Sequence, residues 1–152
     1  MTVHDRLKEQ NLSLPETPPI GGLYTPVKVV GKLAYVSGCG PYIKGSNAKI
    51  LGKVGKDLSL EEAGVAARQT ALNVLSVLDH YVGLEQVKSI VKLLAFVQSA
   101  PGFNDQPKVI NYASGLLNDV FPDTGGHARS AIGTNELPGN IAVEIEAIVE
   151  LF

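Results

Sequence analysis

The run IAVEIEAIVEL at residues 141–151 alternates apolar residues with glutamates and alanines at a period of two. Successive side chains of a β-strand point to opposite faces, so this alternation separates an apolar face from a mostly acidic one. The apolar face would consist of Ile141, Val143, Ile145, Ala147, Val149 and Leu151. The other would carry Glu144, Glu146 and Glu150. We therefore predict a half-buried C-terminal strand, whose apolar face another layer of the protein must cover.

Two segments have the spacing of helices that could form this layer. Ser59-Leu60-Glu61-Glu62 matches a capping box and predicts a helix start. Its predicted apolar face contains Leu60, Gly64, Ala67, Ala71, Val74, Leu75, Leu78 and Val82, with Glu62, Gln69, Asn73, Ser76 and His80 opposite. A second helix is expected from about Gln106 to Val120, with the stripe Val109, Ala113, Leu116, Leu117 and Val120.

The remaining strand signals complete the fold prediction. Residues 24–38 contain two short β-type runs separated by Gly31-Lys32, a plausible hairpin. Residues 89–99 are nearly continuously apolar, as in a central strand covered on both faces. The order ββ-α-β-α-ββ predicts an α+β sandwich, with two helices on one face of a mostly antiparallel sheet. The second face of the last strand also carries Ala142, Ile148 and Phe152, which favours self-association.

Length and composition narrow the possible functions. The chain has 152 residues, 45% of them hydrophobic, which suits one globular domain. Its formal charge of −2, without a basic block, argues against nucleic-acid and membrane partners. The single Cys39 excludes an internal disulfide, and the three histidines lack metal-ligand spacing, so we expect no metal or cofactor. Without a secretory h-region or an apolar run of about 18 residues, a cytoplasmic location is expected.

The N-terminal region and one long loop differ from the predicted core in composition. Residues 2–12 could form a short amphipathic helix, followed by a proline-rich extended stretch at 14–22. We divide the chain into an extension, residues 1–20, and a single domain, residues 21–152. The Gly- and Lys-rich residues 39–57 predict a loop of the kind that often borders a site.

The stretch DTGGHARSAIG at residues 123–133 places one arginine at the start of a strand. The planar guanidinium of Arg129 can bind a carboxylate through two parallel hydrogen bonds, although a surface or ion-paired arginine is the commoner case. Glu144 could act as a general acid or base, or belong to a solvated strand face. A hairpin through residues 135–140 would lay Arg129 beside Glu144. Ser37 and Cys39 lack a nearby histidine, so a nucleophilic role is not favoured.

Taken together, these segments resemble the RidA/YjgF family. The resemblance covers about residues 23–151 and is carried by five segments in order: Tyr24, the YVSG strand end, and the stretches at 67–87, 91–122 and 127–149. It implies a chorismate-mutase-like α+β subunit in a homotrimer with clefts between subunits. Family members include deaminases that hydrolyse enamine or imine intermediates to keto acids without a metal or cofactor.

The resemblance also implies roles for individual residues. Arg129 would hold the carboxylate of an imino or keto acid, and Glu144 would serve the water and proton transfers. The residues that would line the cleft are Tyr24, Ser37, Gly38, Asn111 and Ala131. Alternatives are a non-catalytic binder of small carboxylates and a related small-molecule hydrolase with another substrate.

The chain departs from the familiar deaminases at three places. It inserts DTGGH before Ala128-Arg129, it has Ala131 where cysteine is frequent, and residues 1–20 are additional. The insertion alters the wall of the expected cleft. We hypothesise that Thr124 and His127 enter the site.

Overall fold

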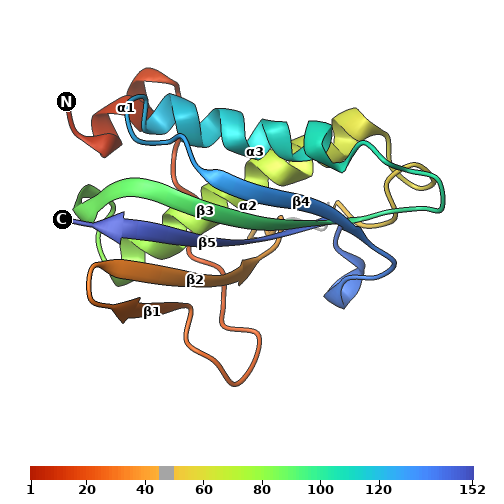
Figure 1. The fold of residues 1–152 in the computed structure, drawn as a ribbon, viewed down its shortest axis with the longest axis horizontal. Helices are drawn as coiled ribbons and strands as arrows, with labels where there is room; N and C mark the ends of the chain where they lie inside the picture. Colours follow the sequence, from red (N-terminus) through yellow and green to blue (C-terminus); the bar gives the residue numbers. More distant parts are fainter. Residues whose placement is uncertain (45–49) are drawn as a thin grey trace.

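The computed structural model describes residues 1–44 and 50–152 and has the predicted α+β architecture. Five strands form one sheet in the order β1-β2-β5-β3-β4, and the two long helices lie on one of its faces (Figure 1). The strands are β1 (Val27–Val30), β2 (Leu33–Cys39), β3 (Val87–Gln98), β4 (Ala128–Thr134) and β5 (Val143–Leu151). The helices are α1 (Val3–Glu9), α2 (Leu60–Tyr81) and α3 (Gln106–Val120), with short 3-10 turns η1 (Leu84–Gln86) and η2 (Pro138–Asn140).

The two long helices begin and pack largely as their sequences predict. The Ser59 hydroxyl accepts a hydrogen bond from the Glu62 amide, and the Glu62 carboxylate accepts one from the Ser59 amide, each at 3.1 Å. This capping box satisfies amides that the first turn of α2 leaves free. The predicted apolar stripe of α3 is wholly buried. Together α2 and α3 cover the apolar face of the sheet and form the core.

Asn73 and Ser76, which the helical spacing places opposite the apolar face of α2, are nevertheless buried. The Asn73 amide donates to the carbonyl oxygens of Gly40 and Tyr42, each at 2.8 Å. The Ser76 hydroxyl donates to the Pro15 carbonyl at 2.7 Å. The N-terminal stretch and the loop after β2 therefore cover this side of the helix. Helical periodicity shows which face of a helix is polar, but not whether that face is exposed. A polar side chain can be buried when backbone carbonyls accept its hydrogen bonds.

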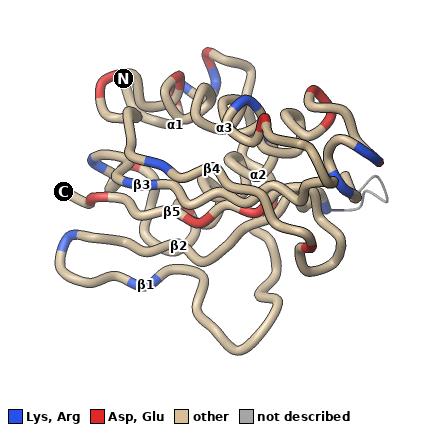
Figure 2. The backbone as a smooth tube through the Cα atoms, turned by 45° about the vertical axis from the view of Figure 1, so that its right-hand side comes forward, with Lys and Arg blue, Asp and Glu red and all other residues tan. Residues whose placement is uncertain are grey.

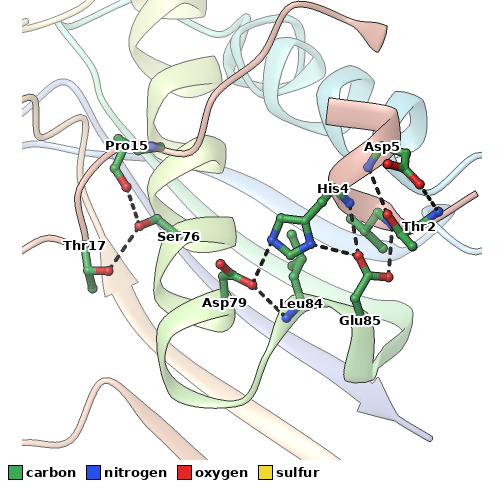
Figure 3. Close-up of polar contacts among 10 residues, drawn as sticks. Thr2, His4, Asp5, Pro15, Thr17, Ser76, Asp79, Leu84 and Glu85 are labelled. Carbon is green, nitrogen blue, oxygen red and sulfur yellow. Dashed lines mark hydrogen bonds and ion pairs between the residues drawn. The ribbon is translucent and has the colours of Figure 1, made fainter. Parts of the chain in front are cut away.

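The N-terminal segment is docked on the domain, and its short helix forms as predicted. Val3 and Leu7 of α1 are buried in the core. The His4 ring lies between two carboxylates, 2.8 Å from Glu85 and 3.2 Å from Asp79 (Figure 3). Figure 3 also shows Ser76 in contact with Pro15 and Thr17, further along the segment. Residues 1–17 thus run along the end and side of α2.

The sheet places β5, the most regularly alternating strand, in its centre. β5 pairs antiparallel with β2 and with β3, while β4 pairs parallel with the outer edge of β3. The hairpin between β1 and β2 forms as predicted, with Gly31 at a φ of 58° that suits glycine. The predicted hairpin that would lay β4 beside β5 is wrong. The β3-α3-β4 crossover carries β4 to the far side of β3, because such connections place the second strand parallel to the first.

One face of the sheet remains open in the single chain. Buried and accessible residues largely alternate along β3, so the prediction of a strand covered on both faces is wrong for the single chain. The open face carries apolar side chains from several strands, among them Tyr35, Leu94 and Ile148. Ala142, which the sequence placed on this face, is instead fully buried just before β5 begins. Phe152 remains exposed at the end of the chain.

Candidate functional site

Arg129 is held by α3 at the edge strand of the sheet. In the register of β4 it pairs with Leu93, whose side chain is buried beneath the helices, so Arg129 also projects toward the helical side. Its guanidinium donates to the Asn111 side-chain oxygen at 2.8 Å, the Ser114 hydroxyl at 3.0 Å and the Pro107 carbonyl at 3.3 Å. Because a helix repeats every 3.6 residues, these three acceptors share one face of α3.

The arrangement around Arg129 leaves its charge uncompensated. All three acceptors are neutral, and no carboxylate of residues 1–44 or 50–152 lies within ion-pair distance of the guanidinium. Three of the five N–H groups are engaged by the chain, which leaves two for another acceptor. A positioned arginine with unused donors is suited to binding a carboxylate.

Three other residues singled out in this region differ in their placement. Ala131 follows Arg129 by two positions on the same face of β4 and packs, partly buried, against the core. His127 does enter the surroundings of Arg129, since its ring contacts the Ser114 hydroxyl at 2.9 Å. Thr124 is not among the residues that contact Arg129. Thr124 lines a hollow with Met1 and Phe152, and its carbonyl accepts from the Ile90 amide.

Tyr24, Ser37, Gly38 and Glu144 form a second group around the end of β2. The Ser37 hydroxyl donates to the Thr25 carbonyl at 2.7 Å, and the Tyr24 hydroxyl accepts from the Gly21 amide at 3.1 Å. The pairing of β2 with β5 shifts register between Val36 and Cys39. At this irregularity the Glu144 side chain lies against the backbone of Gly38, where a Cβ would come within 3.0 Å of the carboxyl carbon.

The environment of Glu144 favours its protonated form. Partial burial raises the pKa of this carboxyl, and the neighbouring negative charge of Glu146 raises it further. A carboxyl with a raised pKa is a stronger base than a free glutamate and holds its proton to higher pH, which suits proton transfer. The red backbone segments of β5 that mark glutamates include some near the middle of the sheet, whereas the blue Lys and Arg segments are dispersed over the described chain (Figure 2).

A cavity of about 290 Å³ adjoins this second group. Tyr24, Ser37 and Gly38 contribute to its lining, and most of its remaining wall is apolar. The wall includes Pro18, Pro19, Ile20, Cys39, Leu51 and Ile141. The N-terminal stretch was predicted only as an extended connection, and its closely spaced prolines are the signal that it could form a fixed wall. The predicted loop 39–57 contributes Cys39–Tyr42 and Leu51, while its residues 45–49 lie outside the described residues.

Cys39 does not have the properties of a nucleophile. Its side chain is buried, and desolvation, with a smaller contribution from the charge of Glu144, raises the pKa of the thiol to about 12. Because the thiolate is the reactive form of cysteine, this residue is inert at neutral pH. The sequence-based preference against a nucleophilic cysteine agrees with this geometry.

Arg129 and Glu144 are not neighbours within one chain. β3 separates their strands, and Arg129 aligns across the sheet with Ala147, whereas Glu144 aligns with Ile132 of β4. Ala147 and Glu144 are three residues apart on β5, so their side chains, and hence those of Arg129 and Glu144, point to opposite faces. The chain therefore carries two separate clusters, which we call the arginine half-site (Arg129, Asn111, Ser114) and the glutamate half-site (Glu144, Tyr24, Ser37, Gly38).

The fold and the two half-sites define a small α+β domain that presents a positioned arginine at the edge of its sheet. The chain belongs to the family described as "YjgF/chorismate_mutase-like, putative endoribonuclease", whose model matches residues 4–151. The resemblance to the RidA/YjgF family is thereby confirmed. Within the described residues, no helix has the length and apolar character that a membrane crossing needs.

Individual relatives agree with this assignment. The chain is 29% identical over 139 residues to the 2-iminobutanoate/2-iminopropanoate deaminase of Dermatophagoides farinae, covering 91% of this chain and 93% of the relative. It is 45% identical over 102 residues to protein TCP17 of Trypanosoma cruzi, covering 66% of this chain and only 64% of that protein. The crystal structure of Atu1372, of unknown function, from Agrobacterium tumefaciens is 39% identical, with a TM-score of 0.88 over 99% of this chain and 92% of that one.

Proposed function

We propose that this chain forms a homotrimer whose inter-subunit clefts hydrolyse enamine or imine intermediates to 2-keto acids. In this proposal the arginine half-site binds the substrate carboxylate and Glu144 transfers the protons. The similarity to the Dermatophagoides farinae deaminase supports the reaction class. No metal or cofactor takes part in the proposed reaction.

The observation that carries the proposal is the uncompensated charge of Arg129. Three neutral oxygens of α3 fix the guanidinium, and two N–H groups stay available. Arginine side chains are mostly exposed, and they are almost never fully buried unless paired. A cation fixed by neutral acceptors favours an anion from outside the chain, and the Nε–H and the second Nη1–H stay available to it.

The separation of the two half-sites supports an oligomeric site. Within one subunit β3 lies between Arg129 and Glu144, which face opposite sides of the sheet. A substrate that contacts both must therefore lie between copies of the chain. The open sheet face, with Tyr35, Leu94 and Ile148, offers an apolar surface for such copies to bury.

The proposed chemistry needs few groups because a protonated imine is already electrophilic. Arg129 orients the acid, water adds to the imine carbon, and Glu144 takes a proton from that water. The same carboxyl returns this proton to the carbinolamine nitrogen, and the C–N bond breaks to release ammonia. The proton left on the carbinol oxygen passes to the ammonia, giving a 2-keto acid and ammonium. The raised pKa of Glu144 suits the proton-donating step. Orientation of the bound acid supplies much of the acceleration.

The test is a coupled assay in which an amino-acid dehydratase or oxidase generates the imine and keto-acid release is followed. The wild type should accelerate release, Arg129→Ala should abolish both acceleration and 2-keto acid binding, and Glu144→Gln should slow turnover while retaining binding. Exposed His80 on α2 supplies a control, His80→Gln, with unchanged rates. If the wild type binds 2-keto acids but does not accelerate keto-acid release, the chain is a non-catalytic carboxylate binder and not a deaminase. Normal 2-keto acid binding by Arg129→Ala would refute both.

A further inference from the structure

Residues 123–127, which connect α3 to β4, follow a path fixed by close backbone packing. The Gly125 amide donates to the Phe121 carbonyl at 2.6 Å. A Cβ on Gly125 would lie 2.6 Å from the Leu117 carbonyl oxygen, which no side chain can do without displacing the end of α3. This path carries His127 to the side of α3, next to Ser114 and two residues before Arg129.

The hydrogen bonds from His127 to Arg129 have only one consistent direction when the ring is neutral. The Gly125 carbonyl can only accept, so His127 Nδ1 carries the hydrogen. The other ring nitrogen, Nε2, then accepts from the Ser114 hydroxyl at 2.9 Å. The Ser114 oxygen in turn accepts from Arg129 Nη1 at 3.0 Å. The donors thus run in one direction, from Arg129 to Ser114, from Ser114 to His127 and from His127 to the Gly125 carbonyl. We call this series of hydrogen bonds the relay.

We propose that His127 is a positioning residue for Arg129, acting through the Ser114 hydroxyl. A serine hydroxyl in a helix can turn its hydrogen toward the carbonyl four residues earlier, here that of Ile110. His127 Nε2 instead accepts the hydrogen bond of this hydroxyl, which leaves a lone pair of the Ser114 oxygen directed at the guanidinium. The insertion before Arg129 thus supplies a second support for the arginine, beside Asn111.

This role rests on the proposed function for its effect on substrate. Loss of the relay loosens the guanidinium before the carboxylate arrives, so the affinity for 2-keto acids falls while the turnover of bound substrate changes little. One hydrogen bond to a charged group corresponds to about a 10-fold loss in affinity. A general-acid role for His127 would instead lower kcat.

The variants are Ser114→Ala, which removes the link, His127→Leu, which removes its acceptor, and His127→Gln, which retains an acceptor oxygen. His80→Leu is the matched control, since His80 is an exposed histidine outside the relay. Binding of 2-oxobutanoate is measured by calorimetry, and KM and kcat by the coupled assay. We expect about a 10-fold rise in Kd and KM for Ser114→Ala and His127→Leu. Partial recovery is expected for His127→Gln, and no further loss when His127→Leu is added to Ser114→Ala.

A second measurement is independent of substrate. The side-chain Nε–H signal of Arg129, identified by its absence in Arg129→Lys, is followed by ¹⁵N NMR in each intact variant. Ser114→Ala and His127→Leu should both broaden it or speed its exchange with water, and His127→Gln should do so less. An unchanged signal in the two variants, or additive binding losses, would overturn the positioning role. A wild type that binds no 2-keto acid would refute the proposed function alone, because the NMR comparison still tests the relay.

Discussion

Replacing Gly38 by alanine should separate catalysis from stability. The added Cβ would lie 3.0 Å from the Glu144 carboxyl carbon, where ordinary contact begins at 3.4 Å, so the carboxyl must move by roughly 0.4 Å. The displaced group is the half-exposed end of a flexible side chain, and alanine is itself worth about 0.5–1 kcal/mol over glycine in a strand. We therefore expect the free energy of unfolding to change by less than about 1 kcal/mol.

The same displacement should be costly for turnover. A misplacement of about 1 Å can cost on the order of 100-fold in rate, so a shift of roughly half that size should lower kcat about 10-fold. The assay compares kcat in the coupled imine assay with urea unfolding of the same preparation. Gly115→Ala in α3 is the control, because a Cβ there meets nothing within 4 Å and should leave kcat unchanged. Full turnover by a normally folded Gly38→Ala would refute the assigned position and role of the Glu144 carboxyl.

Three further predictions concern packing, pH and thiol chemistry. Gly64→Ala should destabilise the fold by about 1–2 kcal/mol in urea unfolding, because its Cβ would meet the Tyr112 ring at 2.6 Å, and Tyr112→Ala should remove most of this loss. The hydrogen bond to Glu85 raises the pKa of His4 above 6.5 in the folded protein. The protonated His4 ring therefore stabilises the fold fully at a pH below 6.5, and this contribution is lost as the pH rises through the raised pKa. His4→Ala should thus lower the melting temperature more at about pH 6 than at about pH 9, and an equal lowering at both pH values would contradict this. Cys39, buried with a pKa of about 12, should resist a disulfide reagent until the chain is unfolded, and rapid labelling of the native protein would show the burial to be wrong.

The elements predicted correctly are those specified by local sequence. The capping box at Ser59 joins residues three apart, and the period of two in residues 143–151 follows from the geometry of one strand. The α3 stripe behaves in the same way, because helical spacing and burial coincide there. These signals needed no knowledge of distant segments, and together they were sufficient for the element order and the α+β class.

The errors and omissions arose where distant segments meet. Burial of Asn73 depends on carbonyls more than 30 residues away, at Gly40 and Tyr42, which no helical pattern encodes. The relay through Ser114 required the exact path of a loop that approaches α3 from the other side. One signal was available: Ser114 follows Asn111 by three positions, so the two share a helix face as soon as Asn111 is taken to point at Arg129.

The wrong strand order has a functional consequence. A hairpin between β4 and β5 would have placed Arg129 beside Glu144, and opposite charges at such short range lower a carboxyl pKa and occupy the guanidinium. Neither group could then perform its proposed task, because the arginine would be neutralised before substrate arrived and the glutamate would be too weak a base. The observed order puts β3 between them and points them to opposite faces. Glu144 keeps its raised pKa and Arg129 keeps free donors. In the proposed oligomer the two groups would meet across a substrate held between copies of the chain.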